Sequence, residues 1–292
     1  ATAVVLIPFA DWLVKLSLLM VKDDKPEGER HPELHTLDEK LYNSPAMALA
    51  VAMKAVAAAG RLAQLNFERG CKVLAKYDPA LAAEIDKDED CIDQFTDNSD
   101  RFLIGLSKMV ETEADDRQLD MLMQTVPNFE RIGDYATNMV ELAQRMQSEN
   151  AAFSETAKKE LVLITQAVNE ILDITVSAFS NDDNEAAKAI EPLEETIDDM
   201  IMMLKDRHTK RLKNGQCSIA SGLVFMEALT YFERASDQCS SIAVMMLARN
   251  NEQILQNHYE YLREIHAGND VVYLAEKDRR REQYIKPLKQ IV

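Results

Sequence analysis

The sequence is poor in the residues that interrupt helices. It contains 8 glycines and 8 prolines in 292 residues, about half of the ordinary share of roughly 12% for these two residue types together. Aromatic residues are also few, at 6%, whereas hydrophobic residues make up 47%, which is enough for a folded core. The scarcity of breakers predicts long uninterrupted helices, arranged in one large or two modest domains.

Positive charge is scarce as well. The 33 lysines and arginines are outnumbered by 50 acidic residues, so the formal net charge is −17. Because contacts with phosphate backbones need a basic surface, this balance excludes a general nucleic-acid binder. The four cysteines (71, 91, 217 and 239) show no C-x-x-C spacing, which argues against a zinc–thiolate site or a disulfide framework and indicates a reducing compartment.

Several catalytic motifs are missing. The chain has no phosphate-binding glycine loop, no G-x-S-x-G and no H-E-x-x-H. None of its five histidines follows an acidic residue by three positions, so the Glu-x-x-His motif of ferritin-like di-iron bundles is absent. These absences disfavour a hydrolase or an oxidase.

The first residues form the most apolar stretch of the chain. Residues 3–21 (AVVLIPFADWLVKLSLLMV) approach the ~20 residues that span a bilayer. Pro8, Asp11 and Lys15 interrupt this stretch, and a charge at mid-membrane costs about 2.5–3.5 kcal/mol. Two interpretations stay open, the end of a membrane helix or an amphipathic helix on the protein's own core. With the charged linker that follows, this start is assigned to residues 1–44.

From Pro45 onward the hydrophobic pattern has a helical period. We expect six long helices, over about residues 45–76, 79–109, 113–147, 154–181, 184–213 and 218–249. Pro127 should kink or interrupt the third helix, and Asn214-Gly215 is the clearest helix end. No alternating strand pattern is present, so the fold is expected to be all-α. A C-terminal helical region follows the break at Asn250-Asn251 and occupies residues 251–292.

The two groups of three helices repeat the same motif. Phe129-Glu130-Arg131 with Asp134 recurs as Phe232-Glu233-Arg234 with Asp237, a separation of 103 residues in both cases (233 − 130 and 237 − 134). One helix earlier, the pair Glu89 and Asp93 has a counterpart in Glu194 and Asp198. Acidic residues four apart share one helical face, so each half is predicted to present the same set of carboxylates.

These eight carboxylates are the candidate site. Their neighbours are apolar or small, which predicts a face partly inside the bundle, where carboxylates need protons, arginines or cations. Oxygen ligands without thiolate or imidazole favour Mg²⁺, Mn²⁺ or iron. Other acid pairs with the same spacing are expected on solvated faces: Glu84/Asp88, Asp86/Asp90, Glu111/Asp115, Asp116/Asp120 and Glu191/Glu195.

The basic run Lys277–Arg281 near the C-terminus has two interpretations. It is either a solvated helix or a contact for an acidic surface or a lipid headgroup.

The duplicated F-E-R-x-x-D motif resembles that of the PhoU family, over about residues 45–249. The segments Leu37–Lys40 and Ser44–Leu49 are similar to the region that follows the membrane part of bacterial Na⁺/phosphate cotransporters with a C-terminal PhoU-like domain, and the apolar start resembles their last membrane helix. The resemblance implies two tandem up-down three-helix bundles, here residues 45–150 and 151–250. It also implies a regulator of phosphate uptake whose acidic motifs hold multinuclear metal clusters.

Carried onto this sequence, the metal ligands are Glu89, Asp93, Glu130, Asp134, Glu194, Asp198, Glu233 and Asp237. The expected cofactors are divalent or trivalent ions of Fe, Zn, Mn or Mg. The expected partner is a membrane transporter domain of the same or a neighbouring chain, at the cytoplasmic face of a bacterial inner membrane, with a homodimer left open and no nucleic acid. The function expected is regulatory and not enzymatic. The alternatives are a metal-free helical scaffold and a carboxylate-bridged metalloenzyme.

Overall fold

The computed structural model describes residues 30–267 and 270–291, and this part of the chain consists of helices and their connections without any strand. The helices are η3 (Pro32–His35), η4 (Glu39–Asn43), α3 (Pro45–Ala75), α4 (Pro79–Leu106), α5 (Glu113–Ser148), α6 (Glu155–Asn181), α7 (Asn184–Ala187), α8 (Ile190–Lys213), α9 (Ile219–Arg249), α10 (Glu252–Gln256), α11 (His258–His266) and α12 (Val271–Gln290). The prediction of an all-α fold is confirmed. The apolar residues 3–21 lie outside the described residues.

The long helices begin and end where local chemistry favours it. Asp78 accepts hydrogen bonds from the backbone N–H groups of Ala80 and Leu81, and Pro79 occupies the first turn of α4, where a missing N–H costs nothing. Ser154 caps α6 in the same way. At the other end of α6, Asp182 adopts a left-handed conformation with φ 54°, a common helix stop.

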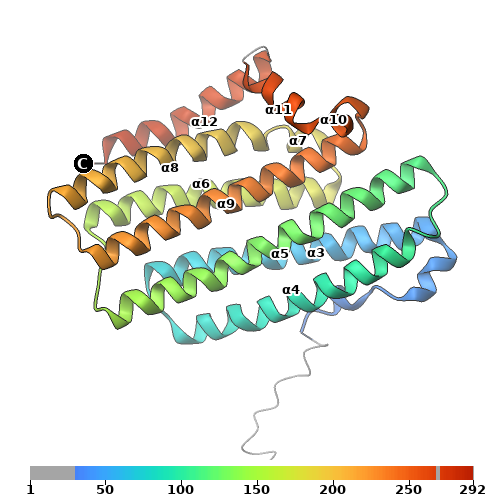
Figure 1. The fold of residues 1–292 in the computed structure, drawn as a ribbon, viewed down its shortest axis with the longest axis horizontal. Coiled ribbons are helices and arrows are strands. Elements are labelled where there is room, and N and C mark those ends of the chain that lie inside the picture. The colour runs from blue at the N-terminus through green and yellow to red at the C-terminus, as the bar shows by residue number, and fades with distance from the viewer. Residues whose placement is uncertain (1–29, 268–269, 292) are drawn as a thin grey trace, which may run out of the picture.

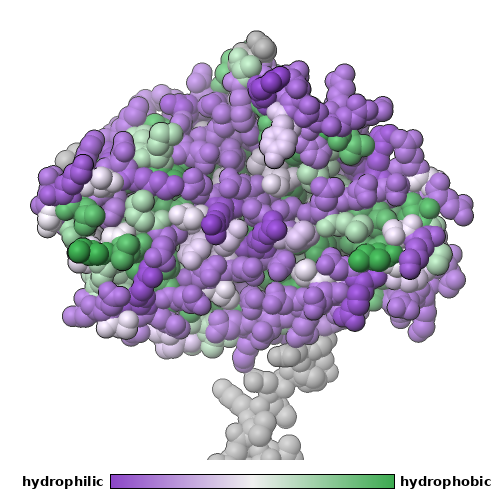
Figure 2. Space-filling model, in the orientation of Figure 1, coloured by the Kyte–Doolittle hydropathy of each residue, from purple (hydrophilic) through white to green (hydrophobic). Residues whose placement is uncertain are grey.

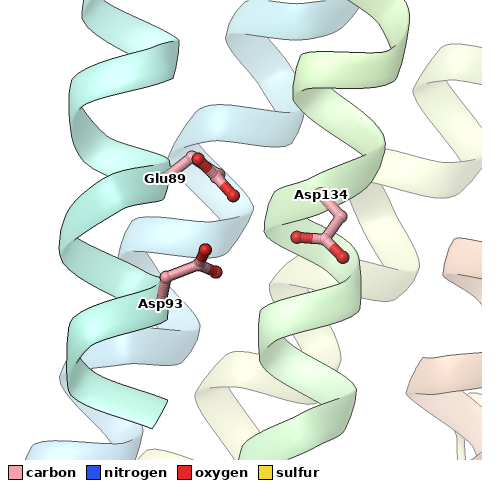
Figure 3. A group of neighbouring side chains, drawn as sticks. All are labelled: Glu89, Asp93 and Asp134. Atoms are coloured by element: carbon pink, nitrogen blue, oxygen red, sulfur yellow. The ribbon is translucent and has the colours of Figure 1, made fainter. Parts of the chain in front are cut away.

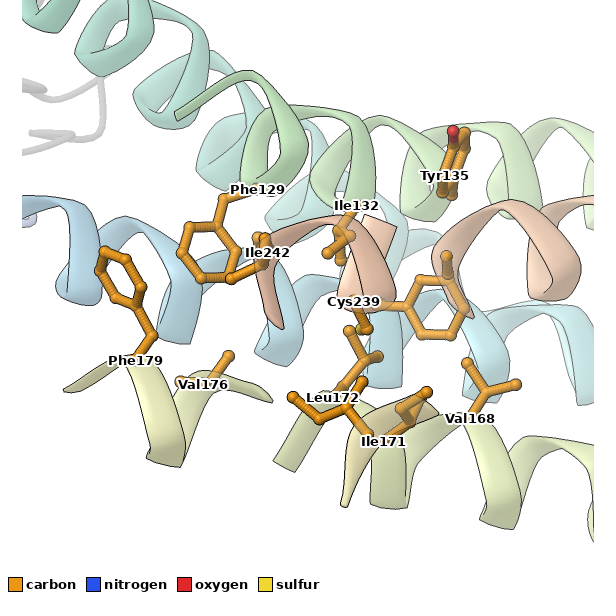
Figure 4. Close-up of a cluster of buried hydrophobic side chains, with 14 of the residues drawn as sticks. Phe129, Ile132, Tyr135, Val168, Ile171, Leu172, Val176, Phe179, Cys239 and Ile242 are labelled. Atoms are coloured by element: carbon orange, nitrogen blue, oxygen red, sulfur yellow. The ribbon is translucent and has the colours of Figure 1, made fainter. Parts of the chain in front are cut away.

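The helices form two bundles that share one core (Figure 1). In the first, α3 packs against α4 and α5, and in the second, α6 packs against α8 and α9. The motif helices α5 and α9 lie side by side and join the bundles, as do α3 and α6. Figure 4 shows the apolar cluster at this junction, where the buried rings of Phe129 and Phe179 meet edge to face with centroids 5.5 Å apart.

Two helix boundaries differ from expectation. Pro127 does not interrupt α5, which is continuous over Glu113–Ser148 because its apolar face is held against α3, α4 and α9, so of the two expected effects, a kink or an interruption, the interruption is wrong. The helix expected over 184–213 is split into α7 and α8. Pro192 lies in the first turn of α8, and a proline ring clashes with the carbonyl four residues earlier, here that of Lys188, just beyond the end of α7.

Two of the described helices, α3 and α6, are long and apolar enough to cross a membrane by length and composition. Both face the shared core, and the buried residues of α3 include Leu49, Val56 and Phe67. Core helices of a bundle have this same composition, so the finding is weak support for a membrane span.

The C-terminal extension, residues 251–291, runs back along the second bundle. Its last helix, α12, packs against α8 and α6 (Figure 1). Figure 2 shows the molecule in the same view, and the surface visible there is largely hydrophilic.

The basic run of α12 does not lie free in solvent. Three of its side chains pair with acids of the bundle: Lys277 with Glu195, Arg280 with Glu170 and Arg281 with Asp199.

Candidate metal centre

The first acidic cluster lies between α4 and α5. Glu89 and Asp93, four residues apart, project from one face of α4 toward Asp134 of α5 (Figure 3). One carboxylate oxygen from each residue lies within 4.8 Å of the others. The helices approach closely here because Gly133, next to Asp134, faces Ile92 of α4. A Cβ on Gly133 would lie 3.0 Å from the Ile92 Cδ1 atom.

Burial and mutual repulsion perturb these carboxyl groups. Burial, followed by the charges of Asp93 and Asp134, raises the pKa of Glu89 to about 7. The pKa values of Asp93 and Asp134 are raised as well, in both cases chiefly by burial. Near neutral pH the cluster therefore carries excess negative charge that a proton or a cation can neutralise.

The second acidic cluster occupies the equivalent position in the other repeat. Glu194 and Asp198 of α8 and Asp237 of α9 also bring carboxylate oxygens within 4.8 Å of one another. Burial and the charges of Glu191 and Asp198 raise the pKa of Glu194 to about 9. Burial and the charge of Asp237 raise the pKa of Asp198 to about 6.

The geometry and the donor set fit a bound cation. Oxygens on opposite sides of an ion lie at most about 4.8 Å apart when each metal–oxygen distance is about 2.4 Å, and the oxygens of both clusters lie within this limit. The charges of Arg131, Lys205 and Arg234 lower the pKa values of Asp134, Asp198 and Asp237, but burial outweighs these charges and all three pKa values stay raised. Oxygen-only ligands suit hard or borderline ions.

The remaining two predicted ligands differ between the repeats. Glu130 lies close enough to Asp134 and Asp93 for their charges to raise its pKa, although burial is the larger cause. Glu233 instead accepts a hydrogen bond from the Lys205 ammonium at 2.7 Å. The structure thus brings six of the eight predicted carboxylates into two groups of three. Glu130 lies beside the first group, and Glu233 lies beside the second, where its charge raises the pKa values of Asp198 and Asp237 while Lys205 pairs with it.

Two acids assigned to solvated faces are in fact buried. Asp88 is 2% exposed and pairs with Arg30 and Arg69. Glu191 is 8% exposed and accepts hydrogen bonds from Ser240 and His266. Helical spacing alone could not distinguish these acids, because their burial depends on partners 19 to 75 residues distant.

The acids that surround the second cluster were also missed as a group. Glu191 and Glu195 flank Glu194 on α8, and both contact the C-terminal extension through His266. The only indication in the sequence was the basic run of α12, whose acidic contact surface turns out to lie within the same chain.

Comparison with known proteins agrees with this duplicated arrangement. The PhoU domain matches the chain twice, over residues 56–143 and 161–246. This chain belongs to the PhoU domain family. The first copy of the domain includes Glu89, Asp93 and Asp134, and the second includes Glu194, Asp198 and Asp237, so each PhoU domain contributes one acidic cluster.

Two curated relatives extend the comparison. A phosphate-specific transport system accessory protein PhoU homolog from Aquifex aeolicus is 25% identical over 146 residues, or 50% of this chain and 65% of the relative. A putative inorganic phosphate export protein, YjbB, from Salmonella typhimurium is 22% identical over 257 residues, or 87% of this chain and 47% of the relative. The chain thus spans between about half and two thirds of the length of these relatives.

Solved structures share the fold. PhoU from Streptococcus pneumoniae superposes with a TM-score of 0.64 at 18% identity and covers 72% of this chain and 99% of its own. PhoU from Pseudomonas aeruginosa gives a TM-score of 0.64 at 20% identity and covers 71% of this chain and 98% of its own. The prediction of a PhoU-like fold with two repeats is confirmed.

Proposed function

We propose that this chain is a regulatory domain of phosphate transport whose two acidic clusters each hold divalent or trivalent cations. The observation that carries the proposal is that each PhoU domain holds a group of three carboxylates on the equivalent pair of helices, α4 and α5 in the first domain and α8 and α9 in the second. The names of the relatives, an accessory protein of phosphate transport and a putative phosphate exporter, support the regulatory role.

The side chains of each cluster would bind the cation from two different helices. Glu89 and Asp93 supply oxygens from α4 while Asp134 supplies them from α5. A bound cation supplies positive charge that offsets the repulsion between these carboxylates. The carboxylates in turn fix the spacing of α4 and α5, and thereby the surface that the bundle offers to a partner. No residue is assigned a catalytic role.

The proposed partner is a membrane transporter of phosphate, on the same or a neighbouring chain. The match to the Salmonella protein supports this choice, since 87% of this chain aligns with 47% of a longer protein named for phosphate export. Coupling to sodium, a position at the cytoplasmic face of the inner membrane and assembly as a homodimer are further parts of this proposal.

The proposal is tested by measuring bound metal. Fe, Zn, Mn and Mg are quantified by elemental analysis in the purified chain and in two double variants, Glu89→Gln/Asp134→Asn and Glu194→Gln/Asp237→Asn. Each variant should lose the metal of one cluster, which is about half of the total if both bind equally. Asp86→Asn/Glu141→Gln, which removes one exposed acid from each of the helices α4 and α5, is the matched control. Unchanged metal content in both cluster variants contradicts the site assignment.

A metal-free scaffold is the second candidate, and the ion pair between Lys205 and Glu233 favours it for the second repeat. In a scaffold, lysine and arginine side chains of the protein neutralise the acids. A chelator should then change neither the melting temperature nor partner binding. A fall of several degrees in chelator supports the metal-binding proposal instead.

A further inference from the structure

Helix α8 carries two rows of acidic side chains with different surroundings. Glu194 and Asp198 belong to the second cluster, whereas Glu191, Glu195 and Asp199 face the C-terminal extension. Each residue of the second row is one or three positions from a ligand of the cluster, so it lies within one helical turn of that ligand.

The extension supplies a positive or titratable group to every acid of the second row. The His266 Nε2 atom lies 2.8 Å from a Glu191 oxygen, and Ser240 donates to the other oxygen of Glu191 at 2.5 Å. Glu195 accepts hydrogen bonds from the Lys277 ammonium and the Tyr273 hydroxyl. Arg281 pairs with Asp199.

These polar contacts act beside a limited set of apolar ones in the first part of the extension. Helix α11 contains no buried residue, and Val271 and Val272 at the start of α12 are 78% and 79% exposed, whereas Ile254 and Tyr273 are buried. A cavity of about 830 Å³ lies between the extension and the region around α7. Farther along α12, Tyr284, Ile285 and Leu288 are buried. The ion pairs with α8 therefore help to hold the middle of the extension, between these apolar contacts.

The first cluster has no contact with the C-terminal extension, and the segment that packs against its helix α4 is the one before α3, with η3 and η4. Its helices, α4 and α5, pack against α3 and against each other, and α5 also packs against α9. The extension packs against α8, α6 and α9. Arginine side chains also bind one residue away from a ligand of the first cluster, because Arg30 and Arg69 pair with Asp88, next to Glu89. The two clusters therefore differ in which part of the chain supplies these basic side chains, and only the second cluster receives them from the C-terminal extension.

We propose that docking of the C-terminal extension and cation binding at the second acidic cluster oppose each other. This inference rests on the proposed function, because it requires that the cluster binds a cation. A cation at Glu194, Asp198 and Asp237 reduces the negative charge of α8 that attracts Lys277 and Arg281. Conversely, these two side chains repel an arriving cation. Binding at the second cluster thus loosens the extension and makes it available to a partner, whereas the first cluster responds independently.

The test uses Mn²⁺ and the full chain. Glu89→Gln/Asp93→Asn/Asp134→Asn leaves only the second cluster, and Glu194→Gln/Asp198→Asn/Asp237→Asn leaves only the first. In the first background, Lys277→Gln/Arg281→Gln should tighten Mn²⁺ binding by about fivefold, as typical couplings between two sites do. In the second background the same change should leave the Mn²⁺ affinity unchanged. Both are measured by titration calorimetry.

The matched control is Arg279→Gln/Lys286→Gln. It removes the same two charges from α12, but from side chains that pair with Glu276 and Glu282 of α12 itself. This control should leave Mn²⁺ affinity at the second cluster within twofold of the parent value.

A measurement on the unmodified chain is independent of how the variants fold. Because coupling is reciprocal, Mn²⁺ should accelerate amide hydrogen exchange across residues 271–281 severalfold, without accelerating exchange in α4. Mn²⁺ binding at both clusters with unchanged or slower exchange in α12 overturns the coupling alone. If Mn²⁺ binds at neither cluster, the proposed function and the coupling are overturned together.

Discussion

Single carboxyl groups in this protein differ in charge because their helices place them in different surroundings. Asp86 of α4 is exposed, whereas Asp88 is buried beneath two arginines and His31. Glu89, the next residue, is half-buried among other carboxylates and has a raised pKa. Three acids within four positions therefore have three roles, as a solvated surface charge, as an anchor for the segment before α3, and as a candidate ligand.

Asp88→Asn should destabilise the protein. The Asp88 carboxylate lies 2.6 Å from an Arg69 nitrogen and 2.7 Å from an Arg30 nitrogen. Loss of hydrogen bonds between charged groups at a buried site should lower the free energy of unfolding by about 1–3 kcal/mol. Urea unfolding measures the change, and the exposed Asp86→Asn on the same helix is the control. Equal stability of the two variants would contradict an anchoring role for Asp88.

The pKa of Glu194 predicts how stability depends on pH in the metal-free protein. The pKa is about 9 when folded, against an ordinary value of 4.5, so the folded state holds a proton that the unfolded state has released. The contribution of this protonated carboxyl group to the free energy of unfolding is complete below pH 4.5 and is lost as the pH rises through 9. In chelator, the melting temperature should fall between pH 6 and 9, and Glu194→Gln should reduce this fall. The exposed Glu264→Gln should reproduce the wild-type profile, and an identical profile for Glu194→Gln would refute the assignment.

Whole helices show which structural information the sequence contains. The bounds of α3, α5, α6 and α9 lie within about two residues of the predicted ones, because proline, Ser and Asn mark these ends by local chemistry. The sequence does mark the split between α7 and α8. Pro192 lies in the third turn of the helix expected over 184–213, where a proline breaks or kinks a helix, and it occupies the first turn of the observed α8. The passage of α5 through Pro127 depends on packing from three other helices, which no local pattern encodes.

Gly70→Ala should weaken the contact between α3 and α5. A Cβ on Gly70 would lie 2.9 Å from the Cα atom of Ala136 and 3.1 Å from its carbonyl oxygen, and helix backbones cannot rotate away as side chains can. Overpacking of this kind should lower the free energy of unfolding by about 1–3 kcal/mol, as measured by denaturant unfolding.

Gly105→Ala provides the comparison for that variant. The nearest atoms to its Cβ would belong to the Tyr42 side chain, which is only partly buried and can move. A larger loss of stability for Gly105→Ala than for Gly70→Ala would contradict the expectation that the close approach of α3 and α5 excludes a side chain at residue 70.

At the scale of the whole molecule, the candidate site was only partly predictable. The repeat located six carboxylates that the fold brings together, because duplicated spacing reports duplicated geometry. It did not reveal that Lys205 holds Glu233, or that the extension covers α8. Contacts such as Glu195 with Lys277, 82 residues apart, leave no periodic trace in a sequence.

The net charge of −17 predicts a response to salt. Self-repulsion among acids disfavours the compact state, and salt screens it. In chelator, the melting temperature should rise by roughly 2–4 °C between 20 and 300 mM NaCl, corresponding to about 1 kcal/mol. Tetramethylammonium chloride at the same ionic strength should give the same rise. A rise specific to Na⁺ would indicate ion binding at the clusters and not screening, and a fall would show that ion pairs dominate.

The motif helices α5 and α9, which hold equivalent places in the two repeats, pack against each other, and Tyr135 of α5 stacks on Tyr231 of α9 with ring centroids 5.9 Å apart. This helix pair resembles the contact across the axis of a symmetric dimer, but both halves here are encoded by one gene. In a true dimer every substitution occurs twice, whereas here each half can change alone. The second half can therefore acquire a covering helix, α12, that the first half lacks, and a single polypeptide can give two acidic clusters of common origin different surroundings.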